Sequence, residues 1–276
     1  MALEPIYAPK DVNPSYHLRY TWTGWPTGDR QFPARPDDSV FQQLAEAWRD
    51  DGIRLLDVQW ADQKLAILTS STPEISPTFL AARIKGRLQH ALRNNGTPTK
   101  FSRKLSVSTV GHNRRDEVEF YVRNQVEREP WADPQFKEFL RQFTVTSNTV
   151  DLSTPTATDS GRYWYNLHLV LVIRDRAKIT NEDWLETLRD TTLRIAEARQ
   201  DRISALSVMP DHLHIALRGH IQRSPQEIAL SYMNNLAHVL QMNALWQPSY
   251  YVGSFGEYDM NALRCRRDGK APSPPT

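Results

Sequence analysis

The sequence of 276 residues has one cysteine, Cys265, which excludes a disulfide within the chain and any cysteine-rich zinc module. It has no run of eighteen apolar residues, and its start, MALEPIYAPK, lacks the basic and apolar regions of a signal peptide. We therefore expect a cytoplasmic protein with no membrane partner. The formal net charge is only +2, so any binding of nucleic acid must depend on local clusters of charge.

The rest of the composition is that of an ordinary globular chain, with 39% hydrophobic and 24% charged residues. One stretch departs from it, because the sequence from Ile75 to Arg115 contains no acidic residue. This stretch is either a solvated helix face followed by a loop or a surface that attracts phosphate groups. Its nine basic residues, our candidates for DNA binding, are Arg83, Lys85, Arg87, Arg93, Lys100, Arg103, Lys104, Arg114 and Arg115.

The two halves of the chain resemble each other at an offset of 149 residues. The apolar positions of a predicted strand match: Tyr16, Leu18, Tyr20 and Trp22 correspond to Tyr165, Leu167, Leu169 and Leu171. At an offset of 148, Ser76 and Pro77 correspond to Ser224 and Pro225, and each pair is predicted to begin a helix. The pattern predicts an internal duplication; a chance match between two amphipathic patterns is the alternative.

Each half is predicted to run strand, helix, strand, strand, helix, strand. This order predicts an α+β fold of two ferredoxin-like α/β sandwiches with antiparallel sheets, arranged as a pseudo-dimer. We expect one module in residues 1–130, a linker in 131–162, a second module in 163–265 and a disordered tail in 266–276.

The second half contains the strand segment Met209-Pro210-Asp211-His212-Leu213-His214. Alternate residues of a strand share a face, so His212 and His214 can bind one metal ion, although two structural histidines would show the same spacing. This segment resembles the metal-binding strand of the single-tyrosine HUH transposases, the IS200-like superfamily that includes REP-associated tyrosine transposases. The other six histidines, which show no ligand spacing, are interpreted as ordinary residues: His17, His90, His112, His168, His220 and His238.

The first half contains Tyr121-Val122-Arg123-Asn124-Gln125, which resembles the tyrosine helix of the same family. Tyr121 and Gln125 are one helical turn apart and share an apolar stripe with Val118, Val122 and Val126. From the residues alone, Tyr121 could equally fill the core with its hydroxyl group at the rim. The resemblance implies that Tyr121 is the catalytic nucleophile and Gln125 a third metal ligand beside His212 and His214. Asp211 and Asn124 are expected to support them.

The first half lacks the histidine pair that the second half retains, and the second half lacks the tyrosine and glutamine that the first half retains. The aligned pairs are His212 with Gln63, His214 with Leu65, Tyr121 with Arg266, and Gln125 with Lys270. The resemblance implies the arrangement of a homodimer, in which the tyrosine helix of one subunit completes the histidine site of the other. We therefore predict one composite site per chain, in a monomer that forms an intramolecular pseudo-dimer.

The resemblance implies an enzyme that nicks and rejoins single-stranded DNA beside hairpins, through a 5′-phosphotyrosine intermediate. Two imidazoles and an amide oxygen suit Mg²⁺ or Mn²⁺ as the divalent metal. The nine basic residues would hold one DNA hairpin on the first half. Two alternatives stay open: a catalytically silent protein that binds DNA hairpins, and a structural protein built from two ferredoxin-like modules.

Overall fold

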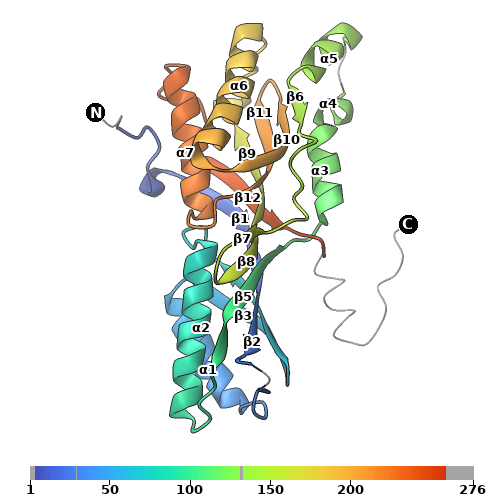
Figure 1. Ribbon diagram of the computed structural model, residues 1–276. Helices are drawn as coiled ribbons and strands as arrows, with labels where there is room; N and C mark the ends of the chain where they lie inside the picture. The colour runs from blue at the N-terminus through green and yellow to red at the C-terminus, as the bar shows by residue number, and fades with distance from the viewer. Residues whose placement is uncertain (1–3, 29, 131–132, 259–276) are drawn as a thin grey trace.

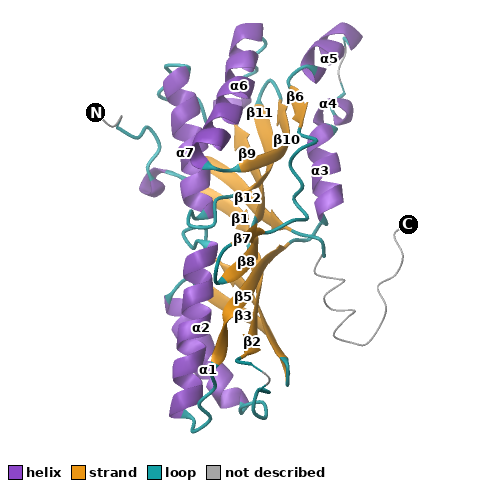
Figure 2. Cartoon of the chain, in the orientation of Figure 1, coloured by secondary structure: helices purple, strands orange, loops and turns teal. Residues whose placement is uncertain are grey.

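The computed structural model describes residues 4–28, 30–130 and 133–258. It contains two six-stranded sheets, which lie end to end along the molecule (Figure 1). Four long helices cover one side, two on each sheet: α1 (Asp38–Asp50), α2 (Pro77–Asn94), α6 (Glu182–Arg199) and α7 (Pro225–Val239). Helix α3 (Arg115–Arg123) lies on the opposite side, against the second sheet (Figure 2). The predicted α+β class, with two mainly antiparallel sheets, is confirmed.

Both sheets contain a four-stranded antiparallel unit with the same strand order. In the first sheet the unit is β3-β4-β2-β5, with strands β2 (Arg19–Pro26), β3 (Ile53–Ala61), β4 (Lys64–Ser71) and β5 (Phe101–Val110). In the second it is β10-β11-β9-β12, with strands β9 (Asn166–Val172), β10 (Arg202–Val208), β11 (His212–Arg218) and β12 (Ser249–Phe255). The predicted order of strand, helix, strand, strand, helix, strand is therefore present in both halves.

The two predicted helix starts are found where the serine-proline pairs stand. Ser76 Oγ accepts a hydrogen bond from Phe79 N at 3.3 Å at the start of α2. Ser224 begins α7 with a capping box, in which its hydroxyl accepts from Glu227 N while the Glu227 carboxylate accepts from Ser224 N. In each helix proline follows the capping serine, where its missing N–H costs no helical hydrogen bond.

Each half also lends a strand to the sheet of the other. Strand β1 (Asn13–His17) precedes β2 but pairs in parallel with β12 of the second sheet. Strand β8 (Gly161–Trp164) precedes β9 but pairs in parallel with β5 of the first sheet. The exchange explains why Tyr16 is 40% exposed, whereas the predicted repeat gave it an apolar strand position matching Tyr165. Tyr16 belongs to the second sheet, and the chain enters the first sheet only after Leu18.

The two sheets meet where the ends of β5 and β12 cross, and the hydrogen bonds there are reciprocal. Thr109 Oγ1 donates to Phe255 O and accepts from Asn166 N, while Ser254 Oγ donates to Val110 O and accepts from Arg19 N. A Cβ atom on Gly111 would clash with Ser254 O, and one on Gly256 would clash with Thr109 O. Glycine at both positions is therefore required by the close approach of the two backbones.

These contacts shift the predicted alignment of the two halves by two residues in the first strand. They match Arg19 with Asn166, an offset of 147 rather than 149. A shift of two preserves the inside-outside alternation of a strand, so the apolar pattern could not distinguish the two offsets.

The shifted alignment also changes which residues of β4 correspond to the histidines of β11. Trp22 then matches Leu169, and their neighbours in the sheets are Ile67 and Ile215. His214 therefore corresponds to Ala66 and His212 to Lys64, not to Leu65 and Gln63. Neither alanine nor lysine supplies the ligand that histidine would, so the first half lacks the histidine pair under either alignment.

The segment 131–162, predicted as a linker, is largely structured over its described residues. They form helix α5 (Pro134–Arg141) and two short strands, β6 (Thr144–Thr146) and β7 (Thr156–Ala157), before β8 begins. Strand β6 pairs with β10, and Leu140, Phe143 and Leu152 are fully buried. Elements this short give no period in the sequence, so the pattern could not predict them. The predicted tail and the positions Arg266 and Lys270 lie outside the described residues.

No helix among the described residues is long and apolar enough to cross a membrane.

Replacing Gly256 by alanine should lower the free energy of unfolding by about 1–3 kcal/mol, because the new methyl group overpacks the crossing of β5 and β12. Gly86→Ala is the matched control: Gly86 lies in α2 with open space around its Cβ position, so alanine should be neutral or stabilising. Urea denaturation of both variants measures the difference. Equal stability of the two would contradict the close approach.

Candidate active site

Helix α3 belongs to the first half by sequence but packs on the second sheet. Val118 and Val122 are buried against Ala205 and Ala216, which are paired neighbours on β10 and β11. Side chains as small as alanine allow the helix to lie close to the strands. The face of the sheet opposite α6 and α7 is therefore covered by an element from the first half of the chain.

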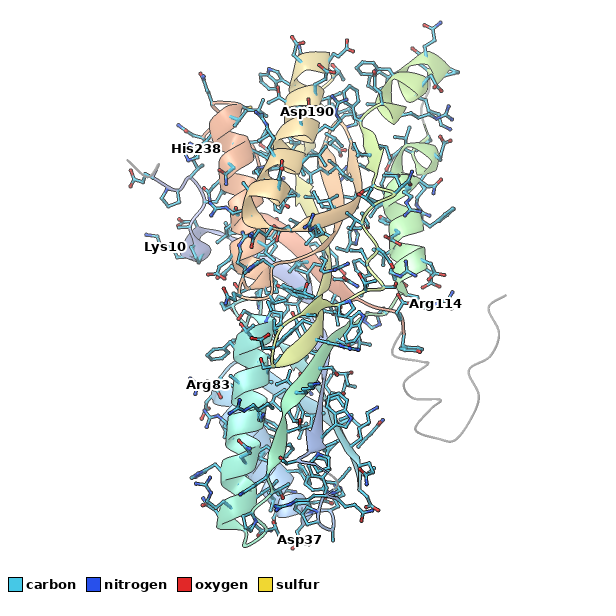
Figure 3. The ribbon with its side chains drawn as sticks, viewed as in Figure 1. Lys10, Asp37, Arg83, Arg114, Asp190 and His238 are labelled. Atoms are coloured by element: carbon cyan, nitrogen blue, oxygen red, sulfur yellow. The ribbon has the colours of Figure 1, made fainter. Side chains whose placement is uncertain are left out.

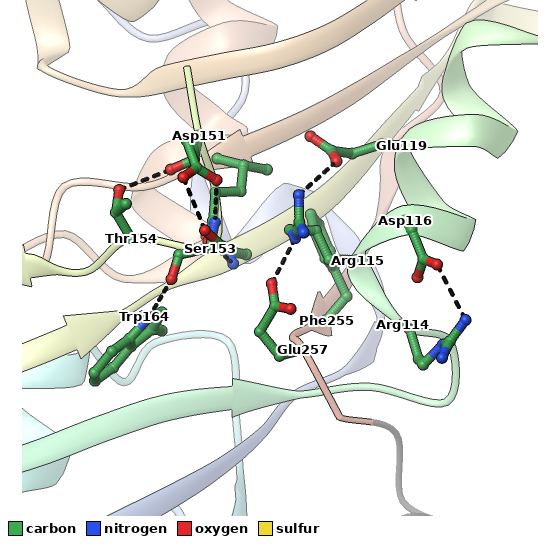
Figure 4. A network of polar contacts seen from close by, with 12 residues as sticks. Arg114, Arg115, Asp116, Glu119, Asp151, Ser153, Thr154, Trp164, Phe255 and Glu257 are labelled. Atoms are coloured by element: carbon green, nitrogen blue, oxygen red, sulfur yellow. Dashed lines mark hydrogen bonds and ion pairs between the residues drawn. The ribbon is translucent and has the colours of Figure 1, made fainter. Parts of the chain in front are cut away.

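A set of polar contacts fixes the start of α3 (Figure 4). Arg115 N donates to Gly256 O at 2.8 Å, and the Arg115 guanidinium pairs with Glu257 at 2.5 Å and with Glu119 at 3.3 Å. Arg114 pairs with Asp116 at 3.0 Å. These contacts tie the first residue of α3 to the end of β12, so the helix direction follows from the strand crossing.

The two histidines of β11 lie under this helix. His212 and His214 face the same side, with ring centroids 4.9 Å apart and planes at 85°. A third imidazole joins them, because His168 on β9 stacks on His214 with centroids 5.1 Å apart. His168 Nε2 and His214 Nδ1 are 2.9 Å apart and share a hydrogen bond.

Tyr121 reaches this histidine cluster from α3. Its ring centroid is 5.4 Å from that of His214 and 5.8 Å from that of His168, both edge to face. The Arg128 guanidinium lies 5.0 Å from the centroid of the tyrosine ring. The structure thus brings the tyrosine of the first half together with the histidines of the second.

Comparison with known proteins agrees with the interpretation of the histidine strand. Residues 162–265 match the family model described as "Transposase IS200 like". The chain carries an IS200-like transposase domain. The family resemblance predicted from the histidine strand is thereby confirmed.

Two solved structures were also found with local similarity to the chain. One is a putative transposase from Deinococcus radiodurans, 21% identical, covering 39% of this chain and 92% of its own, with a TM-score of 0.30. The other is a REP-associated tyrosine transposase bound to a REP hairpin, 16% identical, covering 38% of this chain and 62% of its own, with a TM-score of 0.31. No curated protein sequence matches the chain.

The remaining predicted site residues lie where α3 breaks. Asn124 separates α3 from the short helix α4 (Gln125–Arg128), and its Nδ2 donates to Phe120 O at 2.8 Å. Gln125 is buried, and its Nε2 donates to Tyr121 O at 2.8 Å, which leaves its carbonyl oxygen as the end able to bind a cation. Both amide groups thus donate to the backbone of α3, and the two side chains stabilise the break in the helix beside Tyr121.

Asp211 holds the first histidine of the strand. Its carboxylate is 2.6 Å from His212 Nδ1 and 3.0 Å from Arg176 Nη1. Burial by itself raises the pKa of the Asp211 carboxyl group. The contacts with His212 and Arg176 lower the pKa by more than burial raises it, so the net pKa is below the usual value. Asp211 is therefore an anion that fixes the orientation of the His212 ring.

Burial also sets the charge of the inner histidines. It lowers the pKa of His168 to about 4. It lowers the pKa of His214 well below 6.5, and the neighbouring His168 and His212 lower it further. Both rings are neutral at physiological pH, which is the state in which an imidazole can bind a metal ion.

His168 was interpreted from the sequence as an ordinary residue, and the structure corrects this. A signal was present, since His168 lies between Leu167 and Leu169 and so faces the side of β9 away from the helix-covered core. What the sequence could not show is which strand lies beside β9. The pairing of His168 with Ala216 on β11 places it two residues from His214 on the same face.

The nine basic residues do not form one surface. Figure 3 shows Arg83 on α2 and Arg114 at the start of α3, on opposite sides of the molecule. Arg87 and Arg83 both pair with Asp51, at 2.5 and 3.7 Å, and Lys85 Nζ donates to Ser102 O. Together with Arg114 and Arg115 these residues already have partners. Arg83 stays exposed despite its partner. The candidates that are exposed and form no salt bridge among the described residues are Arg93, Lys100, Arg103 and Lys104.

The buried histidines predict a pH dependence of stability in metal-free buffer. Their folded pKa values lie below the unfolded value near 6.5, so the unfolded chain binds more protons between about pH 4 and pH 6.5. The stability is complete above pH 6.5 and is lost as the pH falls towards 4. At pH 5.5 the loss from His168 should be about 1 kcal/mol.

Urea denaturation from pH 7 to pH 5 with a chelator measures this loss. His168→Asn should flatten the pH dependence, whereas His90→Asn, at an exposed position of α2, should leave it unchanged. The interpretation is wrong if both variants keep the slope of the parent protein.

Proposed function

We propose that this protein cleaves and rejoins single-stranded DNA through Tyr121, at one composite site per chain. The observation that carries the proposal is the edge-to-face contact of Tyr121 with His214, 5.4 Å between centroids, across the boundary of the two modules. In the reaction the phenolic oxygen attacks a DNA phosphorus and the bond to the 3′ oxygen breaks. The products are a 5′-phosphotyrosine and a free 3′-hydroxyl group, and rejoining is the reverse displacement.

We also infer that the chain is a duplicated, ferredoxin-like pseudo-dimer with modules in residues 1–130 and 163–265. The identical strand orders and the reciprocal contacts of Thr109 and Ser254 support this inference. A separate second subunit is then not needed, because α3 of the first module already lies on the second sheet.

The donor set fits a divalent metal ion such as Mg²⁺ or Mn²⁺ at His212, His214 and Gln125. Asp211 engages Nδ1 of His212 and His168 engages Nδ1 of His214, so both rings have Nε2 left for a ligand bond. Within the described residues no three His, Cys, Asp or Glu side chains form a metal site. The amide of Gln125 is proposed as the third ligand because the family resemblance implies it. A bound metal would polarise the scissile phosphate and so favour attack by the phenolic oxygen.

The hairpin is proposed to contact the exposed basic residues at the far end of the first module. Arg93 lies in the last turn of α2, while Lys100, Arg103 and Lys104 lie in and before β5. Positive charge with no carboxylate between Ile75 and Arg115 in the sequence suits the phosphate backbone of a stem.

Tyr121→Phe should abolish a covalent protein–DNA adduct while keeping affinity for DNA, because only the attacking oxygen is removed. Labelled single strands that carry a hairpin are incubated with the protein and Mn²⁺ and separated on a denaturing gel. Tyr258→Phe, an exposed tyrosine on the second module, is the control and should form the adduct normally. An adduct that persists in Tyr121→Phe would show another nucleophile. Hairpin binding with no adduct in any variant would instead support a catalytically silent hairpin-binding protein.

His168→Phe should weaken the binding of Mn²⁺ about 10- to 100-fold, because His214 loses the hydrogen bond that fixes its Nε2 as the ligand atom. Calorimetric titration of the DNA-free protein measures the affinity, with His220→Phe outside the cluster as the control. Unchanged Mn²⁺ affinity in His168→Phe would contradict the assigned role of His168.

A further inference from the structure

The first sheet has a hollow on the side where the second sheet carries the histidines. Its volume is about 710 Å³, and its floor is formed by small side chains of β2 and β4, including Thr21, Ala66 and Ser70. On the second sheet the matching face is covered by α3, whereas among the described residues no helix covers this face of the first sheet (Figure 1). On this side of the molecule the second sheet is therefore covered by α3, whereas the face of the first sheet is open.

The hollow carries an excess of positive charge. Arg19, Arg49 and Arg54 line it, and among the described residues the carboxylate that lines it is that of Asp57. Tyr16, 40% exposed, also lines it and offers an aromatic face. Arginine beside an exposed aromatic ring is the combination that binds single-stranded nucleic acid, through phosphate attraction and base stacking.

The hollow is connected to the histidine cluster by one row of the second sheet. His168 on β9 pairs with Gly253 on β12, which pairs with His17 on β1. Three adjacent strands span about 10 Å, so His17 lies within two strand spacings of His168 on the same face. His17 also lines the hollow.

The junction between the two faces carries two imidazole rings and a guanidinium group. His17 and His112 are edge to face with centroids 5.3 Å apart, and Arg19 Nη1 is 3.4 Å from His112 Nε2. A flexible strand that leaves Tyr121 can therefore pass from the histidine cluster over His17 to Arg19 without crossing a helix layer.

We propose that the open face of the first sheet is a binding groove for single-stranded DNA next to the cleaved phosphate. The inference rests on the proposed function, since it extends the path of the same substrate. The groove is separate from the exposed basic residues assigned to the hairpin. It gives the first module a role in substrate binding on the face where it has lost the histidine pair.

The test uses full-length protein with the Tyr121→Phe change, so that cleavage cannot consume the DNA. Fluorescence anisotropy compares a hairpin alone with the same hairpin carrying a ten-nucleotide single-stranded extension. The extension should raise the affinity of the parent protein at least tenfold. Arg19→Ala with Arg54→Ala should remove most of that gain and leave the affinity for the bare hairpin within twofold. Each phosphate that an arginine no longer neutralises should reduce the salt slope by about 0.7.

Two further variants keep the result interpretable. Arg194→Ala with Arg199→Ala, both exposed on α6 across the sheet, is the matched control and should bind the extension normally. Arg54→Glu changes an exposed residue without opening the fold and should lower the affinity further than alanine does.

The proposal is overturned if the Arg19 and Arg54 variants bind the extended hairpin as tightly as the parent protein, or if the extension adds nothing to the parent. Failure of the proposed function gives a different result. In that case the extended strand binds through Arg19 and Arg54, but protein with Tyr121 intact forms no adduct.

Discussion

The arrangement of the whole molecule depends on the crossing of β5 and β12. Two glycines, Gly111 and Gly256, allow the strand ends to touch, and the hydroxyl groups of Thr109 and Ser254 satisfy the backbone there in a reciprocal way. Because β5 passes β12 at this point, the helix that follows β5 emerges over the second sheet instead of its own. The position of Tyr121 is thus decided by a backbone crossing several residues before it in the chain.

The histidine cluster shows how burial and charge are balanced under that helix. Three imidazoles in contact would repel one another if protonated, and burial removes that problem by keeping His168 and His214 neutral. The anion Asp211 lies at the outer edge, where Arg176 and solvent compensate it. The inner part of the site is therefore polar but uncharged.

The sequence predicted the parts of this structure that depend on local chemistry. Ser76 and Ser224 marked helix starts through their capping hydroxyls, and the spacing of His212 and His214 placed both on one face. Partners distant in sequence could not be predicted. His168 joins the site through the pairing of β9 with β11. Arg87 forms an ion pair with Asp51, which the fold brings next to it, and so its charge is already compensated. The alignment of the repeat failed by two residues because strand alternation repeats every two.

The asymmetry of the two faces follows from the same facts. Covering a sheet face with a helix requires small or apolar side chains beneath it, which Ala205 and Ala216 supply on the second sheet. At the places comparable to Ala216 and Ala205 the first sheet has Leu68 and Asp57, which are paired neighbours on β4 and β3. Arg19 and Arg54 line the same hollow, and burying these charged groups under an apolar helix would leave them without water. A face that cannot be covered at low energetic cost stays available to a charged ligand. The two halves therefore differ in chemistry as well as in motifs: a helix covers small side chains on one face, whereas the other face is open and lined by arginines.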